Sequence, residues 1–452
     1  MLDISLFRAD KGGDPEIVRE SQRRRFADVA LVDQVIELDQ EWKAAISHME
    51  TLKMQRNALN KQIGEKRKKK EDATELQGKS VALKKQTEEA EVLKNELESK
   101  RDKTMVVIGN LVHDSVPVDN DEVNNVVVKK SVHPAREEGG LLSHVDLVQM
   151  LDIVDLEQGT TVAGGRGFYL RNEGVLLNQA LIQFALHSSY ERGSMPIMTP
   201  FFMRQDIMGE CAQLAQFDEE LYKVTGEGED KYLIATSEQP LCAMHRHKWF
   251  EEKELPLKYV GYSTCFRKEA GSHGRDTLGI FRIHQFEKVE QFFVTSCNNN
   301  ASWEAFEEML SNAEDFYTSL GLHYQVVNIV SGELNNAAAK KYDLEAWFPH
   351  SKAYRELVSC SNCLDYQSRR LEVRLRTPKP PTGEAKKDYV HMLNCTLSAT
   401  ERTLCCILEN YQTPEGVRIP EALQPFMPGK LSFIPFRKQL DPKTKKLVPI
   451  TK

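Results

Sequence analysis

The chain has 452 residues, too long for one ordinary domain, and its 40% hydrophobic content is enough for at least one large core. Its 60 lysines and arginines against 67 aspartates and glutamates give a net charge of -7, which argues against a protein that coats nucleic acid over its whole surface. No apolar run reaches the length of a membrane span, and the nine cysteines lie in apolar or motif-rich stretches rather than in a small disulfide scaffold. With an N-terminus that lacks an apolar signal core and carries acidic residues, the sequence predicts a cytoplasmic protein with no membrane partner.

The N-terminal quarter has the pattern of two long helices. After a lead, Met1–Arg25, apolar residues keep helical spacing from Asp28, the expected cap, to Ile63. Past the basic run Lys66–Lys70, a second series follows a seven-residue repeat at Leu76, Leu83, Ala90 and Leu97. Two such helices joined once predict an antiparallel hairpin, and a helix of about forty residues spans roughly 60 Å. We therefore expect residues 1–115 to form an N-terminal domain with a long helical arm.

The pattern of this arm fits two roles equally well. A coiled coil of this kind can serve only dimerisation or architecture. Basic residues crowd one end of the hairpin, however, and a cationic rod with few aromatic residues suits a phosphate backbone that is recognised by shape. The candidate RNA-binding residues are Arg56, Lys61, Lys66, Arg67, Lys68, Lys69 and Lys70.

The rest of the chain is expected to hold a linker, a second domain and a tail. Residues 116–140 show little periodicity and are predicted as the linker, and residues 141–436 as the second domain. Residues 437–452 form a basic tail predicted to be disordered, which would add RNA affinity or act in sorting. Gly165 and Gly167 lack the strand and the full glycine spacing of a dinucleotide loop, so they are interpreted as turn glycines.

The central segment, Tyr262–Glu290, is the most informative stretch. Two apolar, β-branched runs, Tyr259–Phe266 and Ile280–Glu287, flank a polar loop with three glycines, which predicts a long hairpin. Arg267, Glu269 and Arg282 are expected to project from the facing strands. Their forked guanidinium groups suit phosphate oxygens, and the carboxylate can receive donor groups, so the hairpin is interpreted as the floor of a nucleotide site.

Four motifs together resemble one family. They are TSEQP from Thr236, FRKEAGSHGRDTLGIFRIHQFEKVEQF from Phe266, ELVSCSNCLDYQSRR from Glu356, and HMLNCTLSATERT from His391. Their order, behind a helical arm, resembles the seryl-tRNA synthetases of the eukaryotic cytosolic type, a class II aminoacyl-tRNA synthetase family, over essentially the whole chain. The resemblance implies an α+β fold: an antiparallel catalytic sheet flanked by helices, preceded by an antiparallel coiled-coil arm. It also implies a homodimer formed around Pro200.

The resemblance further implies a serine-tRNA ligase. Serine and ATP, with Mg²⁺, would give seryl-adenylate, and the seryl group would pass to tRNA(Ser), with tRNA(Sec) expected to be recognised by the same shape. Arg267 would bridge the serine carboxylate and the α-phosphate, and Arg282 would reach the γ-phosphate. The loop Gly271–Gly279 would shift between ATP and the incoming tRNA end.

The remaining roles are also carried over from the resemblance. Glu269 would receive the adenine amino group and Phe286 would stack on the ring, with Arg402 on its other side. Arg267, Glu269, Arg282 and Arg402 form the catalytic set, and the other ATP-binding residues would be Lys268, Ile283, His284, Gln285, Phe286, Glu356, Leu357, Val358 and Ser359, of which Glu356 and Ser359 would hold Mg²⁺. The serine site would comprise Thr236, Glu238, Arg267, Glu290, Asn394 and Thr396.

Several of these residues have plainer interpretations on their own. Thr236 stands where a helix cap is expected, and Arg402 alone would be an ordinary surface residue of a helix. Cys360 and Cys363 could suggest zinc, but no second ligand pair with suitable spacing follows them. The alternative function is a catalytically silent, synthetase-like RNA-binding or regulatory protein, which should have lost one of the phosphate-binding arginines. A class II synthetase for threonine or proline is disfavoured because the N-terminal arm fits neither.

Overall fold

The computed structural model describes residues 1–211, 220–226, 228–269, 278–377, 388–440 and 447–450. It divides into two compact units, Met1–Leu111 and Val112–Lys452, a boundary close to the expected one at residue 115. Most of the loop proposed to move, Gly271–Gly279, lies outside the described residues.

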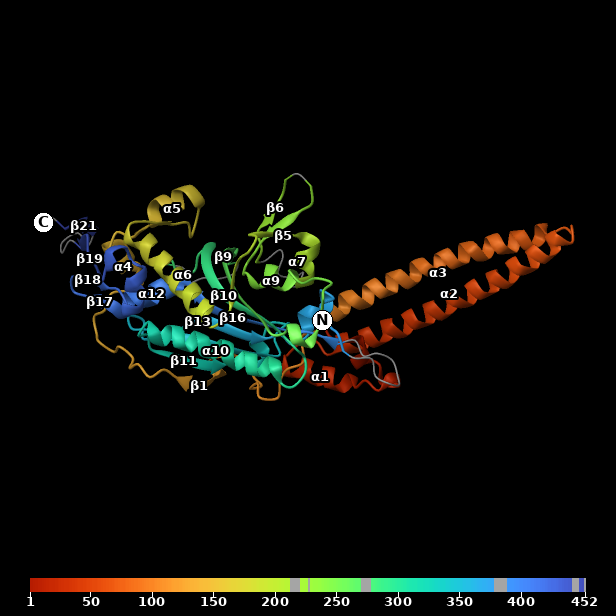
Figure 1. Ribbon diagram of the computed structural model, residues 1–452, viewed down its shortest axis with the longest axis horizontal. Helices are drawn as coiled ribbons and strands as arrows, with labels where there is room; N and C mark the ends of the chain where they lie inside the picture. The colour runs from red at the N-terminus through yellow and green to blue at the C-terminus, as the bar shows by residue number, and fades with distance from the viewer. Residues whose placement is uncertain (212–219, 227, 270–277, 378–387, 441–446, 451–452) are drawn as a thin grey trace. The chain divides into compact units, whose positions relative to one another are not determined.

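The N-terminal unit contains the predicted helical hairpin. Helix α2, Ala30–Lys68, and helix α3, Thr74–Val107, run antiparallel to each other (Figure 1). Leu52 and Ile63 of α2 and Ala90 and Leu97 of α3 are buried along their seam, as the apolar spacing requires. The lead, for which the sequence predicted no particular structure, contains a helix. This helix, α1 (Pro15–Arg24), begins at a proline and is capped by the Asp14 carboxylate, which accepts from Glu16 N–H at 3.0 Å.

A buried ionic cluster fixes the pairing of α2 with α3. The carboxylate of Asp39, only 2% exposed, accepts from Arg8 Nη2 at 2.7 Å and from Arg101 Nη1 of α3 at 3.3 Å. The Arg101 guanidinium also lies over the Trp42 ring, 4.6 Å from its centre. Burial opposes ionisation, yet the hydrogen bonds and charges of Arg8 and Lys43 hold the pKa of Asp39 below its ordinary value. Because a slipped register would leave a buried charge unpaired, this cluster specifies one alignment of the arm.

The second unit is built on an eight-stranded sheet with the order β1-β11-β12-β13-β16-β10-β9-β4. Neighbouring strands are antiparallel except β4 and β9, which run parallel. The strands are β1 (Val126–Lys130), β4 (Met195–Met198), β9 (Leu257–Phe266), β10 (Gln285–Thr295), β11 (Tyr324–Asn328), β12 (Lys340–Phe348), β13 (Ala353–Asn362) and β16 (His391–Ala399). This antiparallel-rich sheet is the predicted fold class.

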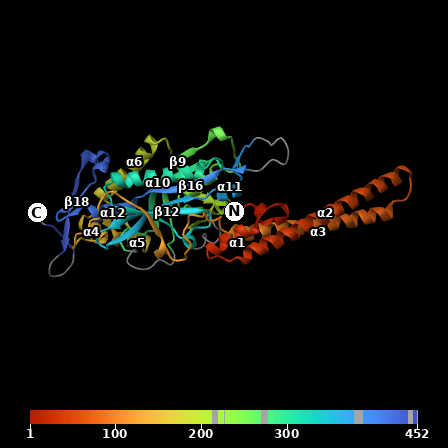
Figure 2. The ribbon, with the colours of Figure 1, turned by 90° about the horizontal axis from the view of Figure 1, so that it is seen from below.

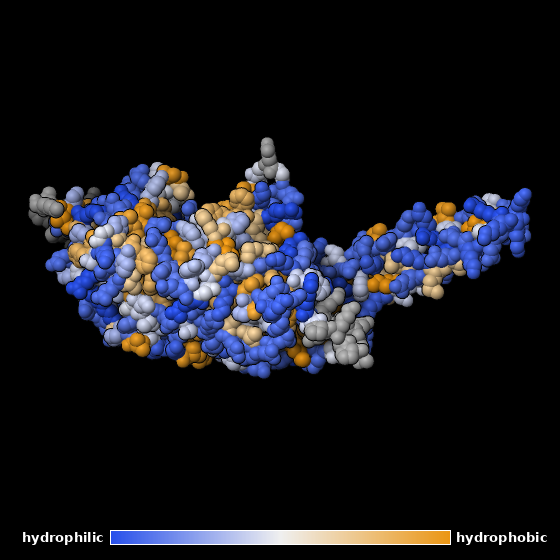
Figure 3. Space-filling model, viewed as in Figure 1, coloured by the Kyte–Doolittle hydropathy of each residue, from blue (hydrophilic) through white to orange (hydrophobic). Residues whose placement is uncertain are grey.

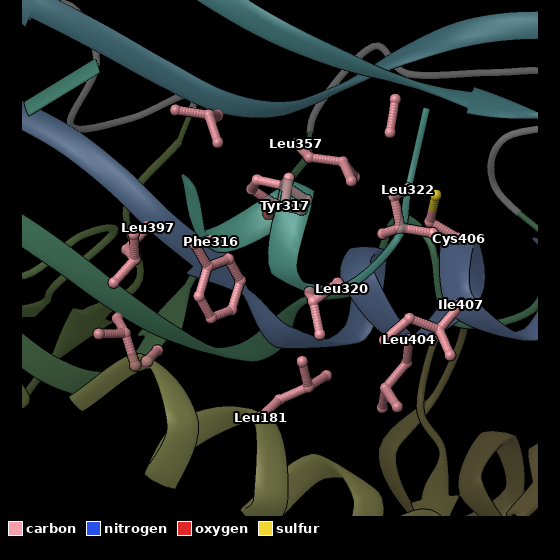
Figure 4. Close-up of a cluster of buried hydrophobic side chains, with 14 of the residues drawn as sticks. Leu181, Phe316, Tyr317, Leu320, Leu322, Leu357, Leu397, Leu404, Cys406 and Ile407 are labelled. Carbon is pink, nitrogen blue, oxygen red and sulfur yellow. The ribbon is translucent and has the colours of Figure 1, made fainter. Parts of the chain in front are cut away.

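Three long helices bury one face of this sheet. Helix α10, Ala301–Ser319, lies along the sheet in both ribbon views, and α6, Glu173–Glu191, and α12, Thr400–Tyr411, complete the layer (Figures 1 and 2). Their apolar side chains meet those of the strands in one core (Figure 4), which includes Leu181, Phe316, Tyr317, Leu397, Leu404 and Ile407. Because the helices cover one face of the sheet, the polar side chains of the central strands lie on the opposite face.

Shorter elements complete the unit. The helices are α4 (His144–Met150), α5 (Leu156–Ala163), α7 (Gln205–Cys211), α9 (Glu238–Ala243) and α11 (Tyr366–Arg370). The small sheets contain β2 (Val154–Asp155), β3 (Tyr169–Leu170), β5 (Phe202–Arg204), β6 (Lys223–Val224), β7 (Lys231–Leu233), β8 (Trp249–Phe250), β14 (Arg374–Leu375), β15 (Asp388–Tyr389), β17 (Gln412–Thr413), β18 (Gly416–Arg418) and β19 (Phe433–Pro435).

Two predictions about irregular segments are wrong. The expected linker, residues 116–140, contains β1, which pairs with β11, so part of it belongs to the eight-stranded sheet. The expected disordered tail contains a small hairpin, β20 (Lys438–Leu440) paired with β21 (Leu447–Pro449). Arg437 anchors it, because its backbone N–H donates to Met150 O at 2.9 Å and its guanidinium donates to Glu173 at 2.6 Å.

The second arm of the central hairpin also begins later than predicted. Strand β10 starts at Gln285, so Ile280–His284 lies outside the ladder. Ile280, Phe281 and Ile283 are buried because they pack into the core, with the Phe281 ring 5.5 Å from that of Phe348. Their apolar spacing therefore reflects packing rather than strand pairing, and Arg267, Glu269 and Arg282 project from the segments that flank the two strands.

Candidate active site

A cavity of about 250 Å³ opens on the sheet face away from the three long helices. Side chains alternate between the two faces of a strand, and this alternation decides which residues form the floor of the cavity. On β10, Phe286, Lys288 and Glu290 line the cavity, whereas Val289 lies in the helix-covered core and Gln291 donates to Met309 O of α10 at 2.9 Å. Strands β13 and β16 contribute Ser359, Ser361, Asn394 and Thr396 to the same floor.

Arg267 lines this cavity, and its charge favours the ionised form of both Glu238 and Glu356. It follows β9 directly, and its backbone N–H donates to His284 O at 2.9 Å, which ties the end of β9 to the segment before β10. Its guanidinium lies over the Phe286 ring, 5.2 Å from the centre, and its Nε is 3.4 Å from Ala235 O. These contacts direct the fork of Arg267 into the cavity, where it can hold two anionic groups at once.

Two further arginines form a cationic end. Arg282 Nη1 lies 3.5 Å from Glu269 Oε2, and Arg402 Nη1 lies 3.5 Å from Glu356 Oε2. The Arg402 guanidinium also lies 5.0 Å from the centre of the Phe281 ring, and this cation–π contact stabilises its position. Guanidinium groups from separate elements converging on one space suit a polyphosphate.

The opposite end is acidic. Glu290, 2% exposed, accepts a hydrogen bond from Thr236 Oγ1 at 2.8 Å and pairs with Lys288. Glu238 accepts from Gln367 Nε2 at 2.7 Å. Thr236 also receives the backbone N–H of Glu238 at 3.3 Å, so its hydroxyl serves both as a local cap and as a part of the site. Buried carboxylates beside a hydroxyl can hold a small ammonium-bearing ligand.

The pKa shifts of the carboxyl groups differ in direction between the two ends of the cavity. Burial, together with the charge of Glu290, raises the pKa of Glu238 to about 7, so this group is largely protonated below neutral pH. Burial also pushes the pKa of Glu356 upward, but Arg402, Lys341 and Arg267 hold it below its ordinary value. Glu356 therefore remains an anion at the cationic end.

Glu356 and Ser359 fit the divalent cation that ATP brings. Both line the cavity, and Asp343, opposite Ser359 in the strand register, has one buried oxygen that finds no hydrogen-bond partner among the described residues. Such oxygen donors are those that Mg²⁺ prefers, and this ion commonly takes only one or two carboxylates together with phosphates and water. Among the described residues no group of three or more His, Cys, Asp and Glu side chains could hold a metal by itself.

Most predicted site residues meet in this cavity. Those that line it are Thr236, Glu238, Arg267, Glu269, Arg282, Ile283, Phe286, Glu290, Glu356, Leu357, Ser359, Asn394, Thr396 and Arg402. Four predicted residues do not: Val358 is buried in the helix-side core, His284 and Gln285 line a neighbouring pocket, and Lys268 lines neither. The register of β13 shifts at Leu357, so Glu356, Leu357 and Ser359 all line the cavity while Val358 faces the core.

Sequence reasoning missed other residues of the cavity, namely Phe281, Lys288, Asn335, Ser361, Ala399 and Glu401. Lys288 could have been found by counting two residues from each of Phe286 and Glu290 along the strand. Cys360 and Cys363, considered for zinc, are both buried cysteines.

Glu401 provides a prediction on pH. Burial raises its pKa to about 8, and its carboxyl accepts from Glu287 N–H at 3.1 Å and from Thr400 Oγ1 at 3.0 Å. The folded state keeps this proton while the unfolded state releases it, so ionisation of Glu401 costs stability as pH rises from about 4.5 to about 8. The free energy of unfolding of the Glu401→Gln variant, relative to that of the wild type, should therefore rise by on the order of a few kcal/mol from pH 5 to pH 8. Urea unfolding at both pH values measures this, and a constant difference between the two proteins would contradict it.

Comparisons with known proteins agree with this geometry. Residues 1–112 match the seryl-tRNA synthetase N-terminal domain, and residues 222–411 match the tRNA synthetase class II core domain (G, H, P, S and T). The cytoplasmic serine–tRNA ligase of Arabidopsis thaliana is 58% identical over 439 residues, 97% of each chain. The chain belongs to the seryl-tRNA synthetase family. Recognition of that family from the motifs is thus confirmed, and its members are enzymes, serine–tRNA ligases of class II.

Solved structures of seryl-tRNA synthetases share the whole fold. The cytoplasmic serine–tRNA ligase of Naegleria fowleri in complex with AMP is 50% identical, with a TM-score of 0.87, over 97% of this chain and 99% of that one. The seryl-tRNA synthetase of Pyrococcus horikoshii complexed with ATP is 40% identical, with a TM-score of 0.87, over 96% and 100% of the two chains. The predicted fold class is confirmed. In the part of the chain that the structure describes, no helix has the length and apolarity needed to cross a membrane.

Proposed function

We propose that this chain is a cytoplasmic serine–tRNA ligase that makes seryl-adenylate and then seryl-tRNA(Ser). The observation that carries the proposal is a single cavity in which Arg267 separates an arginine-rich end from the acidic pair Thr236 and Glu290. ATP fits the first end and serine the second, with their reacting groups at the arginine. The names of its relatives, cytoplasmic serine–tRNA ligases of plants, fungi and mammals, support the assignment.

In the first step a carboxylate oxygen of serine attacks the α-phosphorus of ATP. The bond from that phosphorus to the bridging oxygen breaks, pyrophosphate leaves, and the acyl–phosphate bond of seryl-adenylate forms. Arg267 holds both anions in line, and Arg282 stabilises the charge that accumulates on the leaving pyrophosphate. The attacking group is already an anion, so no general base is required.

The nucleoside part of ATP is held at the cationic end. Phe286 stacks on adenine, Arg402 covers the other face, and Glu269 accepts from the amino group. Glu356 and Ser359 would hold Mg²⁺, which neutralises phosphate charge when it is bound with ATP. Of the remaining predicted ATP residues, Ile283 and Leu357 line the cavity, whereas His284, Gln285, Lys268 and Val358 can contribute only through backbone or neighbouring contacts.

Serine binds at the acidic end. Glu290 and Thr236 receive its ammonium and hydroxyl groups, and Asn394 and Thr396 line the same space, with Glu238 nearby. An alanine would leave buried polar groups unpaired, a discrimination of roughly 10⁴ or more in a well-built site. Threonine would have to be excluded by the space that its extra methyl group needs.

In the second step a terminal hydroxyl of the tRNA attacks the seryl carbonyl carbon, and AMP leaves. The helical hairpin α2–α3 recognises the tRNA by its shape, which extends to tRNA(Sec). The turn end of the hairpin is covered by hydrophilic residues (Figure 3). The basic residues proposed to bind the tRNA on this half of the hairpin are Arg56, Lys61, Lys66, Arg67, Lys68, Lys69 and Lys70.

A second copy of the chain is expected to cover the apolar surface around Pro200. The elements α6, β4 and β5 carry exposed apolar side chains, namely Val175, Leu176, Tyr190, Met195, Met198 and Phe202. Their burial in a homodimer would remove an apolar patch from water. Light scattering should give twice the chain mass of 51.6 kDa, and a monomer at micromolar concentration would contradict the dimer.

Exchange of labelled pyrophosphate into ATP tests the function. We expect exchange that depends on serine and is absent with alanine or threonine at equal concentration. No exchange with any amino acid would favour a catalytically silent RNA-binding or regulatory protein, an alternative that the presence of Arg267, Arg282 and Arg402 disfavours. Exchange with another amino acid instead of serine would overturn the assignment.

A further inference from the structure

Lys288 is a buried lysine on the floor of the cavity. It is 5% exposed and stands on β10 between Phe286, which faces the nucleotide end, and Glu290, which faces the serine end. In the ladder it lies opposite Ser263 of β9 and Ala399 of β16, which are a small hydroxyl and a methyl side chain. A lysine ammonium is rarely placed in such a site unless a charge partner is built beside it.

That partner is Glu290, and the contact is specific to one atom. The Lys288 ammonium pairs with Oε2 of Glu290, the same oxygen that accepts from Thr236 Oγ1 at 2.8 Å. Two groups from different elements thus hold one oxygen of the carboxylate. Among the described residues, Oε1 receives no corresponding hydrogen bond, so it is the oxygen left to accept from a ligand in the cavity.

The charge of Lys288 also matters to the carboxyl groups around it. Burial and the charge of Glu290 raise the pKa of Glu238, whereas Lys288 acts in the opposite direction on the same group. Without this ammonium, the carboxyl groups of Glu238 and Glu290 would face one another with less compensation.

We propose that Lys288 is a positioning residue for the amino acid. It fixes the Glu290 carboxylate so that Oε1 points at the ammonium and hydroxyl of serine, and it acts through Glu290 rather than by touching ATP. This inference rests on the proposed function, because it assigns serine to the Glu290 end of the cavity. It predicts that the lysine governs serine affinity and leaves ATP affinity nearly unchanged.

The test uses pyrophosphate exchange with the full-length protein and the variants Lys288→Met and Lys288→Arg. We expect Lys288→Met to raise the KM for serine roughly 10- to 100-fold, with the KM for ATP within about twofold of the wild type. Lys288→Arg, which keeps a cation, should recover most of the serine affinity. In a Glu290→Gln background the methionine substitution should change the KM for serine by less than about threefold, because the group through which it acts is already altered.

A matched control separates positioning from mere stability. Lys340 is another buried lysine of the same sheet, 8% exposed, whose Nζ donates to Ser115 Oγ at 2.8 Å outside the cavity. Lys340→Met should lower the melting temperature and leave both KM values unchanged. If Lys288→Met does not fold, Lys288→Gln, which is polar and uncharged, replaces it.

The outcomes are distinct. Serine-dependent exchange by the wild type with an unchanged KM for serine in the Lys288 variants would overturn this inference alone. Equal rises in the KM for serine and for ATP would also overturn it, because they indicate a general structural role. Absence of serine-dependent exchange in the wild type would instead overturn the proposed function.

Discussion

Replacing Arg267 with alanine should reduce serine-dependent pyrophosphate exchange by about 10³-fold or more in kcat/KM. The guanidinium is directed into the cavity by Phe286 and Ala235 O, between the acidic and the cationic ends. Its loss removes the group that holds two anions together, and donors aimed at developing charge are each worth about 10²–10³ in rate. The measurement is steady-state exchange with each substrate varied.

The variant Arg267→Lys distinguishes charge from geometry. Lysine keeps the positive charge but lacks the planar fork that can bridge two anions, so we expect it to recover only a small part of the activity. Binding of ATP in the absence of serine should be less affected, because Phe286, Arg402 and Glu269 remain in place for the nucleoside. An Arg267→Ala protein that retains more than about a tenth of wild-type kcat/KM would contradict the proposed role.

The sequence revealed much of this site because its residues stand in long, specific motifs. Arg267, Arg282 and Arg402 each lie in a different motif, and the cavity brings all of them together. Lys288 lies inside one of the same motifs but was overlooked. Its importance depends on which face of β10 it occupies and on its pairing with Glu290, a fact of packing rather than of composition.

Strand boundaries and edge strands were harder to predict, for a physical reason. The short strand β1, with the sequence VVVKK, becomes part of the sheet only by pairing with β11, nearly two hundred residues later in the chain. Nothing local to residues 116–140 indicates that partner. Similarly, Ile280 and Phe281 are residue types common in strands. Their side chains pack into the core that contains Phe348, and the ladder of β10 begins only after them.

The buried ionic cluster of the arm shows the same limit. Helical spacing predicted the apolar seam between α2 and α3, which the buried Leu52, Ile63, Ala90 and Leu97 confirm. It could not indicate that Asp39 would be buried with Arg8 and Arg101, because a charged residue in a helix is ordinarily solvated. This cluster fixes the register of the hairpin and with it the arrangement of basic residues at the turn.

Neutralising the basic turn of the arm should abolish efficient tRNA charging without affecting adenylate formation. In the variant, Lys66, Arg67, Lys68, Lys69 and Lys70 are all replaced by glutamine, which preserves helix propensity. Within the described residues none of these side chains forms an ion pair, and only Lys66 donates a hydrogen bond, to Asp72 O at 3.3 Å, so most of this charge is available to phosphates. We expect kcat/KM for tRNA to fall by about 10²-fold or more at 0.15 M salt, with a salt dependence shallower by roughly 0.7–0.9 per lost phosphate contact.

The returning helix offers a matched control for this prediction. Lys79, Lys84 and Lys85 lie on α3, and each pairs with a glutamate four residues away, at 2.6 Å, 3.8 Å and 3.9 Å, respectively. Because these charges are already partly compensated, their replacement by glutamine should change kcat/KM for tRNA by less than about threefold. Equal losses of kcat/KM for tRNA in the two variants would indicate a response to net charge. Normal charging by the variant of Lys66–Lys70 would exclude the turn as a tRNA-binding surface. In every case serine-dependent pyrophosphate exchange should remain at the wild-type rate, since the catalytic unit, Val112–Lys452, has its own core and carries the whole cavity.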